Sequence, residues 1–219
     1  PPVDGPKTLK RITRDLNKAI FPENYIVPYT QQVHDRVSLE VLRGCTQGCR
    51  FCQAGMITRP VRERPAEQVR TMVAEGLRRT GYDEVSLTSL STADFSGIQE
   101  VVAAAVADDA CGQVSVSLPS LRVDAFTVGI AAELQKARRA GLTFAPEAGT
   151  WRMRQVINKL ISEEDLYAAV EAAYSQGWRR VKLYFLTGLP TETDEDTLAI
   201  LEMARKCIEV GRTHQRSPT

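Results

Sequence analysis

The sequence has no long apolar run, no excess of charge of one sign and few aromatic residues. Its longest wholly apolar stretch is residues 101–107, whereas a helix that crosses a bilayer needs about 20 apolar residues. Its 28 basic and 27 acidic residues nearly cancel, so no overall field favours a polyanion or a membrane surface. The pattern predicts no transmembrane helix and no membrane partner, and charge alone does not indicate nucleic acid.

The amino end also lacks the features of a secretory signal. It begins with Pro1 and Pro2 and has no basic region followed by an apolar stretch and a small-residue cleavage site. Cysteine is scarce and odd in number, with five residues of which three fall within eight positions. Such clustering is typical of a metal site in a reducing compartment rather than of a disulfide framework. We therefore expect a cytoplasmic protein.

The rest of the composition is that of an ordinary globular protein. Hydrophobic residues make up 43% and charged residues 25% of the chain, which excludes disordered and fibrous classes. At about 150 residues per domain, 219 residues suffice for one domain of moderate size or two small ones. Proline and weak periodicity predict a lead-in or linker over residues 1–36, before a truncated core domain over 37–211 and a polar tail over 212–219.

From residue 37 onward, strand-like runs alternate with helical patterns, which is typical of βαβ units and a parallel sheet. Pro65 marks one helix start, and Ser162 with Asp165 forms a capping box at another. The expected strands cover residues 38–42, 84–90, 114–118, 142–145 and 180–186, and the last helix covers 197–210. We predict an α/β fold: a partial (β/α) barrel of about five βα units whose sixth unit is missing, with its chemistry at the carboxyl ends of the strands.

Three cysteines follow the first predicted strand on a glycine-flanked loop. Cys45, Cys49 and Cys52 form a CxxxCxxC pattern between Gly44 and Gly55. Three thiolates can bind three irons of a cubane [4Fe-4S] cluster, whereas an electron-transfer cluster takes four, so one iron would stay open to an exogenous ligand, as in catalytic zinc sites. S-adenosylmethionine supplies an amino nitrogen and a carboxylate oxygen for such a position, and one-electron cleavage of its sulfonium bond yields a 5′-deoxyadenosyl radical.

The loop resembles the cluster motif of the radical SAM superfamily, CxxxCx(aromatic)C, with Phe51 as the aromatic residue. The stretches RGCTQGCRFCQAGMITRPVRER, PSLRVD, FAPEAGT and LYFLTGLPTETDED further resemble an uncharacterised bacterial family in which a cobalamin-binding domain often precedes the radical SAM domain. The resemblance spans residues 35–210. It implies an oxygen-sensitive enzyme that uses a [4Fe-4S] cluster, S-adenosylmethionine and a one-electron reductant such as a flavodoxin or ferredoxin, with cobalamin and flanking domains expected in the full-length protein. It implies no particular substrate.

The resemblance also suggests roles for residues at the strand ends. Superfamily members often have a GGE-like segment that binds the methionine amino group; here Ser89 and Ser91 could replace it or simply form a turn. Arg122 could pair with the methionine carboxylate or with substrate, or form a surface salt bridge. Glu147 is expected to accept the ribose hydroxyls, as acids do in dinucleotide folds.

The fifth strand and the turn after it complete the expected site. Lys182 and Tyr184 occupy alternate positions and so share one face of the strand. They are substrate candidates if that face lines the barrel interior. Otherwise they form an amphipathic pair in contact with the helices. Gly188 and Pro190 resemble the superfamily's adenine-side turn, where glycine permits close approach of the backbone to a flat ring.

Other charged and cysteine residues have simpler interpretations. Arg59, Arg62 and Arg64 could reach an acidic substrate, but such a run is usually solvated surface. Cys111 and Cys207 are expected to pack as small hydrophobic residues.

Two other functions stay open from the sequence alone. A zinc-binding structural or interaction module without catalysis would need a fourth ligand such as His34, and the cysteines could also be buried or form a disulfide. A noncatalytic half-barrel subunit would hold the cluster but make no 5′-deoxyadenosine.

Overall fold

The structure is a computed structural model of the chain, and it describes residues 9–22, 24–30, 32–107, 114–119, 122–123, 126–136 and 141–214. Across those ranges, no helix has the length and apolar character needed to cross a membrane. The parallel strands are β1 (Val37–Glu40), β4 (Glu84–Thr88), β5 (Ser115–Ser117), β6 (Leu142–Glu147) and β7 (Val181–Phe185). The helices that follow them are α2 (Ala66–Thr80), α3 (Ile98–Ala107), α4 (Val128–Lys136), α6 (Glu163–Ser175) and α7 (Asp194–His214).

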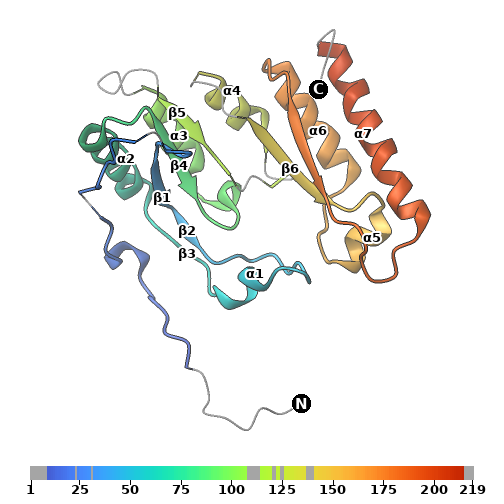
Figure 1. Cartoon of the computed structure of the whole chain (residues 1–219), viewed down its shortest axis with the longest axis horizontal. Coiled ribbons are helices and arrows are strands. Elements are labelled where there is room, and N and C mark those ends of the chain that lie inside the picture. Colours follow the sequence, from blue (N-terminus) through green and yellow to red (C-terminus); the bar gives the residue numbers. More distant parts are fainter. Residues whose placement is uncertain are drawn as a thin grey trace.

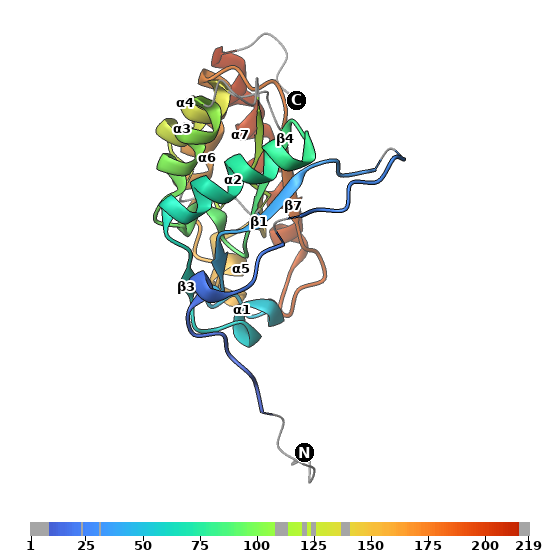
Figure 2. The ribbon, with the colours of Figure 1, turned by 90° about the vertical axis from the view of Figure 1, so that its left-hand side faces the viewer.

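The strands lie on one side of the molecule and the long helices on the other (Figures 1 and 2). One sheet has the order β1-β4-β5 and a second consists of β6 and β7, with every pair in these two sheets parallel. Among the described residues, no strand pairing joins β5 to β6. Five strand-helix units in sequence order confirm the predicted α/β partial barrel.

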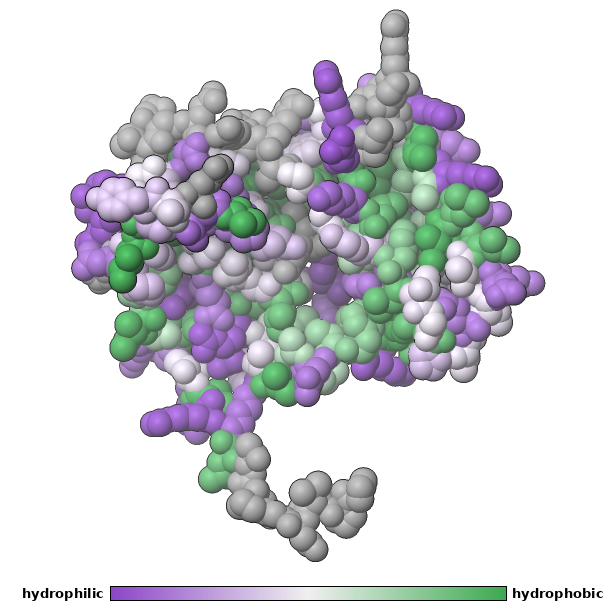
Figure 3. Space-filling view, in the orientation of Figure 1, coloured by the Kyte–Doolittle hydropathy of each residue, from purple (hydrophilic) through white to green (hydrophobic). Residues whose placement is uncertain are grey.

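The two faces of the larger sheet differ in chemistry. Val37 and Leu39 are fully buried, and Val37 packs directly beneath Gly76 of α2. The register places Ser38 beside Ser86, and Ser86 beside Ser117, on the opposite face of the three strands. The face opposite the helices, the open face, therefore carries hydroxyls, with Ser38 exposed and Ser86 buried. Hydrophilic side chains lie in the hollow between the two halves of the molecule (Figure 3).

The helix boundaries follow the sequence signals closely. Ser162 and Asp165 form the predicted capping box of α6, a device that contributes about 1 kcal/mol. Pro65 directly precedes α2, and Gly81 ends that helix in the left-handed conformation with a φ of 72°. The last helix begins at Asp194, three residues before its predicted start, because the acidic turn 194–196 suits a helix amino end.

The sequence did not predict the elements around the cysteine loop. The first predicted strand, 38–42, is interrupted at Val41, whose carbonyl accepts from the Arg64 amide (2.9 Å). The chain then forms β2 (Leu42–Arg43), which pairs antiparallel with β3 (Arg62–Glu63). Short helices complete the structure: η1 (Leu16–Lys18), α1 (Gln53–Ile57), η2 (Thr92–Asp94) and α5 (Trp151–Val156).

The described part of the lead-in contacts the core. Leu16 is buried, and its carbonyl accepts from the Arg64 guanidinium (2.7 Å), while Gln68 of α2 donates to the Asn17 carbonyl (3.1 Å). The division into lead-in or linker, core domain and tail stays a prediction. Cys111 lies outside the described residues.

Candidate functional site

The three clustered cysteines occupy the loop between β2 and α1, beyond the carboxyl end of β1, and all three are partly exposed free thiols. Cys52 caps α1, since its Sγ accepts from the Gly55 amide (3.3 Å), and its own amide donates to the Cys49 carbonyl (3.1 Å). A Cβ added to Gly55 would lie 3.5 Å from the Cys52 Sγ and 3.9 Å from the Cys45 Cβ. The loop therefore brings the Cys45 and Cys52 side chains close to one small residue, Gly55.

Two positive charges from other parts of the chain, Lys159 after α5 and Arg122 after β5, act on Cys49. Burial raises the pKa of its thiol above the usual value, the positive charges of Lys159 and Arg122 lower it, and the neighbouring thiols of Cys45 and Cys52 raise it further. Both positive charges therefore act on the Cys49 thiol. They favour the thiolate, which is the form that binds metal.

Within the described ranges, no three His, Cys, Asp or Glu side chains are close enough to share one metal ion. His34, the expected fourth zinc ligand, is near Arg36 (3.1 Å between Nδ1 and Nη2), and Arg36 pairs with Glu84 at the start of β4 (2.8 Å). His34 precedes β1, whereas Cys45 follows it, and a strand rises about 3.3 Å per residue. The two residues therefore lie toward opposite ends of the sheet, which does not support a zinc site that includes His34.

Arg59 holds the carbonyl groups of the cysteine loop. Its Nε donates to the Cys45 carbonyl (3.2 Å), and its Nη2 donates to the carbonyls of Gln47 (2.9 Å) and Thr46 (3.4 Å). A guanidinium presents five donors in a fixed plane and so suits several acceptors at once. Arg59 is exposed, as expected for a solvated run, and its guanidinium also shapes the loop.

The other two arginines of the run have similar roles. Arg62 donates to the Thr58 carbonyl (2.7 Å). Arg64 is only 4% exposed and donates to the carbonyls of Leu16 (2.7 Å) and Glu40 (3.1 Å). The prediction of a solvated run is wrong for Arg64, because its guanidinium is buried between η1 and the end of β1 and donates to carbonyls of both.

The cysteine loop also docks on the end of α5. The Arg50 amide donates to the Ile157 carbonyl (2.9 Å), and its guanidinium donates to the Gln155 carbonyl (3.2 Å). Asn158, in the left-handed conformation, donates from Nδ2 to the Gly48 carbonyl (2.8 Å). These bonds connect the first βα unit to the fourth.

Glu147 ends β6, as predicted, and has a specific partner. Its Oε1 lies 2.8 Å from the Lys159 Nζ, and both side chains are largely buried. The backbone of Glu147 is left-handed, with a φ of 69°, and its carbonyl accepts from the Leu186 amide (2.8 Å). Because Lys159 also acts on Cys49, the ion pair connects this strand end to the cysteine loop. The ribose-binding role of Glu147 stays a prediction.

Ser89 and Ser91 form the turn after β4. The Ser89 Oγ accepts from the Ser91 amide (3.1 Å), and the buried Ser91 Oγ donates to Asp94 (2.6 Å). These bonds favour the turn-forming interpretation, and cofactor binding by the two serines stays a prediction.

A hollow of about 320 Å³ lies beside the turn. Its lining residues come from β2, from the ends of β1, β4 and α1, and from the start of the cysteine loop: Glu40, Leu42, Arg43, Gly44, Thr58, Thr88, Ser89 and Leu90.

Lys182 and Tyr184 share the exposed face of β7. The intervening residues Val181, Leu183 and Phe185 are partly buried and pack against the core. The two polar side chains therefore point away from the helices, toward the open face, and the interpretation as a pair against the helices is wrong. Their role in substrate binding stays a prediction.

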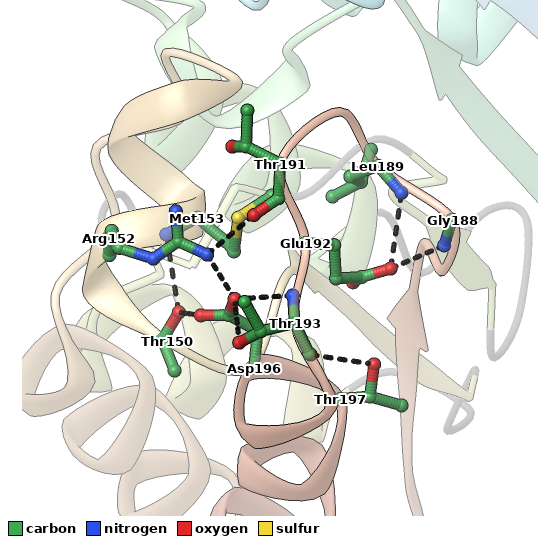
Figure 4. Close-up of polar contacts among 10 residues, drawn as sticks. All are labelled: Thr150, Arg152, Met153, Gly188, Leu189, Thr191, Glu192, Thr193, Asp196 and Thr197. Atoms are coloured by element: carbon green, nitrogen blue, oxygen red, sulfur yellow. Dashed lines mark hydrogen bonds and ion pairs between the residues drawn. The ribbon is translucent and has the colours of Figure 1, made fainter.

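Figure 4 shows the loop that follows β7. Gly188 is left-handed, with a φ of 80°, and no atom of the residues that the structure describes lies within 4 Å of the Cβ that it lacks. The Glu192 carboxylate accepts from the amides of Gly188 and Leu189, the latter at 3.2 Å. The turn thus requires glycine for its conformation and leaves space beside it, as expected; Pro190 within it is exposed. Contact of Gly188 and Pro190 with adenine stays a prediction.

Asp196 is a central residue that the sequence reasoning missed. It is 3% exposed, and its carboxylate accepts from the Thr150 hydroxyl and the Arg152 guanidinium as well as from the amide (2.9 Å) and hydroxyl (2.8 Å) of Thr193 (Figure 4). These bonds tie the loop after β6 to the loop after β7. The sequence did contain a signal, since Thr193 and Asp196 have the spacing of a capping box.

The Asp196 network predicts an acid-dependent stability. The Thr150 hydroxyl, then the Arg152 guanidinium, hold the pKa of this carboxyl well below its ordinary value of 3.8. A depressed native pKa stabilises the fold above the unfolded pKa, and the contribution is lost as pH falls through the native value. Urea midpoints measured from pH 6 to 2 should therefore fall less steeply below about pH 4 for Asp196→Asn than for the wild type. The exposed neighbour Glu195→Gln is the control; equal slopes for all three proteins would contradict the assignment.

Arg154 is the other buried charge that was missed. It is 1% exposed, donates to the carbonyls of Ala148 (3.1 Å) and Gly149 (3.2 Å), and lies 3.4 Å from Glu163. Burial lowers the pKa of its guanidinium, which the charge of Glu163 partly offsets. Cys207 packs in the core as expected, and burial raises the pKa of its thiol to about 11.

Several known proteins are similar to this chain in sequence or in fold. An uncharacterised protein of Methanocaldococcus jannaschii, MJ0966, is 34% identical over 206 residues, which cover 90% of this chain and 45% of that protein. The solved radical S-adenosylmethionine methyltransferase TsrM from Kitasatospora setae, with cobalamin and a [4Fe-4S] cluster bound, has a TM-score of 0.66 and 16% identity, covering 78% of this chain and 34% of TsrM. The cobalamin-dependent S-adenosylmethionine radical enzyme OxsB has a TM-score of 0.62 and 14% identity, covering 76% of this chain and 26% of OxsB.

The chain thus spans less than half the length of each of these relatives. The two solved structures show the fold alone, because their sequence identities are low. The sequence model of the radical SAM superfamily matches residues 39–204, from β1 into α7. With most of its length covered by that match, the chain belongs to the radical SAM superfamily.

Proposed function

We propose that the protein is a radical SAM enzyme in which Cys45, Cys49 and Cys52 hold a [4Fe-4S] cluster and leave one iron open for S-adenosylmethionine. The observation that carries the proposal is the three-thiol loop beyond the carboxyl end of β1, in a chain of this superfamily. A single ion needs its ligands close around one point, whereas each cysteine of a cubane binds a different iron. Three thiols on one loop with two cations beside them fit the second arrangement.

When bound, the cluster and S-adenosylmethionine supply one-electron cleavage of the sulfonium bond to a 5′-deoxyadenosyl radical. Arg59 and Asn158 position the loop through its carbonyls. Lys159 and Arg122 offset the negative charge of the thiolates. Both roles are those of a scaffold that fixes metal ligands in place.

The proposed cofactor site extends over the neighbouring strand ends. The hollow beside Ser89 is close to the loop through Gly44 and offers the half-buried ion pair of Glu40 and Arg43 (2.5 Å), which suits the charged methionine end. Phe51, Ser91 and Arg122 are proposed to border it.

The nucleoside end and the substrate are assigned to the other half of the barrel. Glu147 is proposed for the ribose, and Gly188 and Pro190 for the adenine. Lys182 and Tyr184 on the open face of β7 are the proposed substrate contacts.

The use of cobalamin, the sensitivity to oxygen and the cellular location are also proposals. The fold relatives TsrM and OxsB are described as cobalamin-bound or cobalamin-dependent, and the chain matches 45% of its curated relative. We therefore propose a cobalamin domain in the full-length protein, an oxygen-sensitive enzyme and a cytoplasmic location.

Anaerobic reconstitution tests the proposed reaction. The chain and the full-length protein are loaded with iron and sulfide, reduced with dithionite and mixed with S-adenosylmethionine. We expect about four irons and four sulfides per chain and the formation of 5′-deoxyadenosine, measured by liquid chromatography and mass spectrometry. One zinc per chain, or a cluster that yields no 5′-deoxyadenosine in either protein, would contradict the proposal.

A further inference from the structure

The open face of the two parallel sheets carries few apolar side chains. Its residues include Ser38, Ser86 and Ser117 in the first sheet, and Thr143, Lys182 and Tyr184 in the second. Within the described parallel strands, no Val, Leu, Ile, Met or Phe occupies a position that alternates away from the helices. A (β/α) barrel usually fills its interior with bulky branched residues, so this face suits hydrogen bonding rather than a packed core.

This polarity disfavours an apolar substrate. Hydrophilic side chains lie in the hollow between the two halves of the molecule (Figure 3). A lipid or another hydrocarbon placed there would remove water from hydroxyl groups without replacing the hydrogen bonds that water makes, which costs free energy. A substrate with its own hydrogen-bonding groups avoids that cost.

Each acid on the open face already has a cation as its partner. The ion pairs are Glu40 with Arg43 (2.5 Å), Glu84 with Arg36 (2.8 Å) and Glu147 with Lys159 (2.8 Å). The charges cancel within each pair. These acids therefore do not balance any other cation of the face.

Lys182 is a cation of the open face that no described acid balances. Its side chain is exposed, and within the described ranges neither the Lys182 ammonium nor the Tyr184 hydroxyl has a hydrogen bond or an ion pair with another residue. The register places Thr143 of β6 beside Lys182, and Tyr184 follows two residues later on the same face. An ammonium flanked by hydroxyl donors can bind a single negative charge.

The position of Lys182 along β7 limits the size of such a ligand. The register pairs Lys182 with Thr143, and Phe185 with Glu147 at the end of β6. A strand rises about 3.3 Å per residue, so Lys182 lies about 10 Å from the strand end, where Glu147 is proposed to bind the ribose. A molecule of small-metabolite size can therefore reach from Lys182 to the strand end.

We propose that the substrate is a small polar carboxylate whose charged end binds Lys182 and whose polar groups bind the hydroxyls of Thr143 and Tyr184. The inference rests on the proposed function, which specifies a radical but no substrate. A phosphate monoester carries a charge of about −1.5 to −2 at pH 7, which is more than one ammonium balances. A carboxylate, with a single charge, matches Lys182 better.

Four probes with six-carbon chains test the proposal. Gluconate has a carboxylate and hydroxyls, sorbitol has hydroxyls alone, hexanoate has a carboxylate on an apolar chain, and sorbitol 6-phosphate replaces the carboxylate with a phosphate. Saturation-transfer NMR titrations of the reconstituted chain should give gluconate the lowest Kd. Lys182→Gln should raise that Kd at least about tenfold, because a hydrogen bond to a charged group is lost. The control Lys18→Gln removes an equal charge at an exposed position outside the open face and should leave the Kd within about twofold.

The binding assay and the cleavage assay separate this inference from the proposed reaction. A chain that prefers gluconate but forms no 5′-deoxyadenosine with dithionite contradicts the proposed function and supports the carboxylate site. The carboxylate inference is overturned if none of the probes binds, or if sorbitol, hexanoate or sorbitol 6-phosphate binds at least as tightly as gluconate. It is also overturned if Lys182→Gln and Lys18→Gln have the same Kd for gluconate.

Discussion

Replacing Cys49 with serine is expected to remove most of the iron from the reconstituted protein and to lower 5′-deoxyadenosine formation more than about 100-fold. Even residues that only orient metal ligands change metal affinity 10–100-fold, and Cys49 is proposed as a ligand itself. Its thiol is acted on by the positive charges of Lys159 and Arg122 and by the neighbouring thiols of Cys45 and Cys52. Iron and sulfide analysis, electron paramagnetic resonance of the reduced protein and product assays measure the loss.

Cys207→Ala is the matched control for this variant. Cys207 is a free, buried thiol on α7 that packs in the core, and removing one small core group costs about 1 kcal/mol. The control should retain its iron and its product yield. A Cys49→Ser protein with full iron content and full cleavage would show that the ligands were assigned wrongly.

Gly149→Ala is expected to lower the free energy of unfolding by about 3 kcal/mol, the upper part of the range for overpacked cores. The added Cβ would lie 2.6 Å from both the Asp196 carbonyl oxygen and the Ile200 amide nitrogen. Both contacts are backbone atoms of α7, which cannot rotate away. The helix must move from the loop after β6, and that movement also weakens the bond between Thr150 and Asp196. Urea unfolding followed by circular dichroism measures the change.

Gly141→Ala controls for the loss of a glycine. Among the described residues, no atom lies within 4 Å of a Cβ at Gly141, so the substitution should change the free energy of unfolding by less than about 0.5 kcal/mol. If both alanine variants unfolded at the same urea concentration as the wild type, the close approach of α7 to Gly149 would be refuted.

The local parts of the fold could be predicted from the sequence. The alternation in β7 separates Lys182 and Tyr184 from the apolar residues between them, and burial follows that alternation. The capping box at Ser162 depends on two residues three positions apart. Such signals involve only near neighbours along the chain, so one sequence contains them completely.

The hydrogen bonds that hold the site in place join segments that are distant in the sequence, and they could not be predicted. Arg50 and Gln155 are 105 residues apart, and Arg64 and Leu16 are 48 apart. The sequence does not show which backbone carbonyl an arginine will bind. Arg59, Arg62 and Arg64 therefore resembled solvated surface residues. Glu147 was placed correctly at a strand end, but its pairing with Lys159 depends on how α5 folds back.

The docking of the cysteine loop on α5 has a consequence for how the protein loses its structure. Within the described ranges, β5 and β6 share no backbone ladder, which would allow the two sheets to come apart independently. Arg50 and Asn158 bridge that seam on one side, and α4 packs against α6 on the other. The two sheets and their helices therefore form one cooperative folding unit. Amide hydrogens in both sheets should exchange with solvent through the same global unfolding.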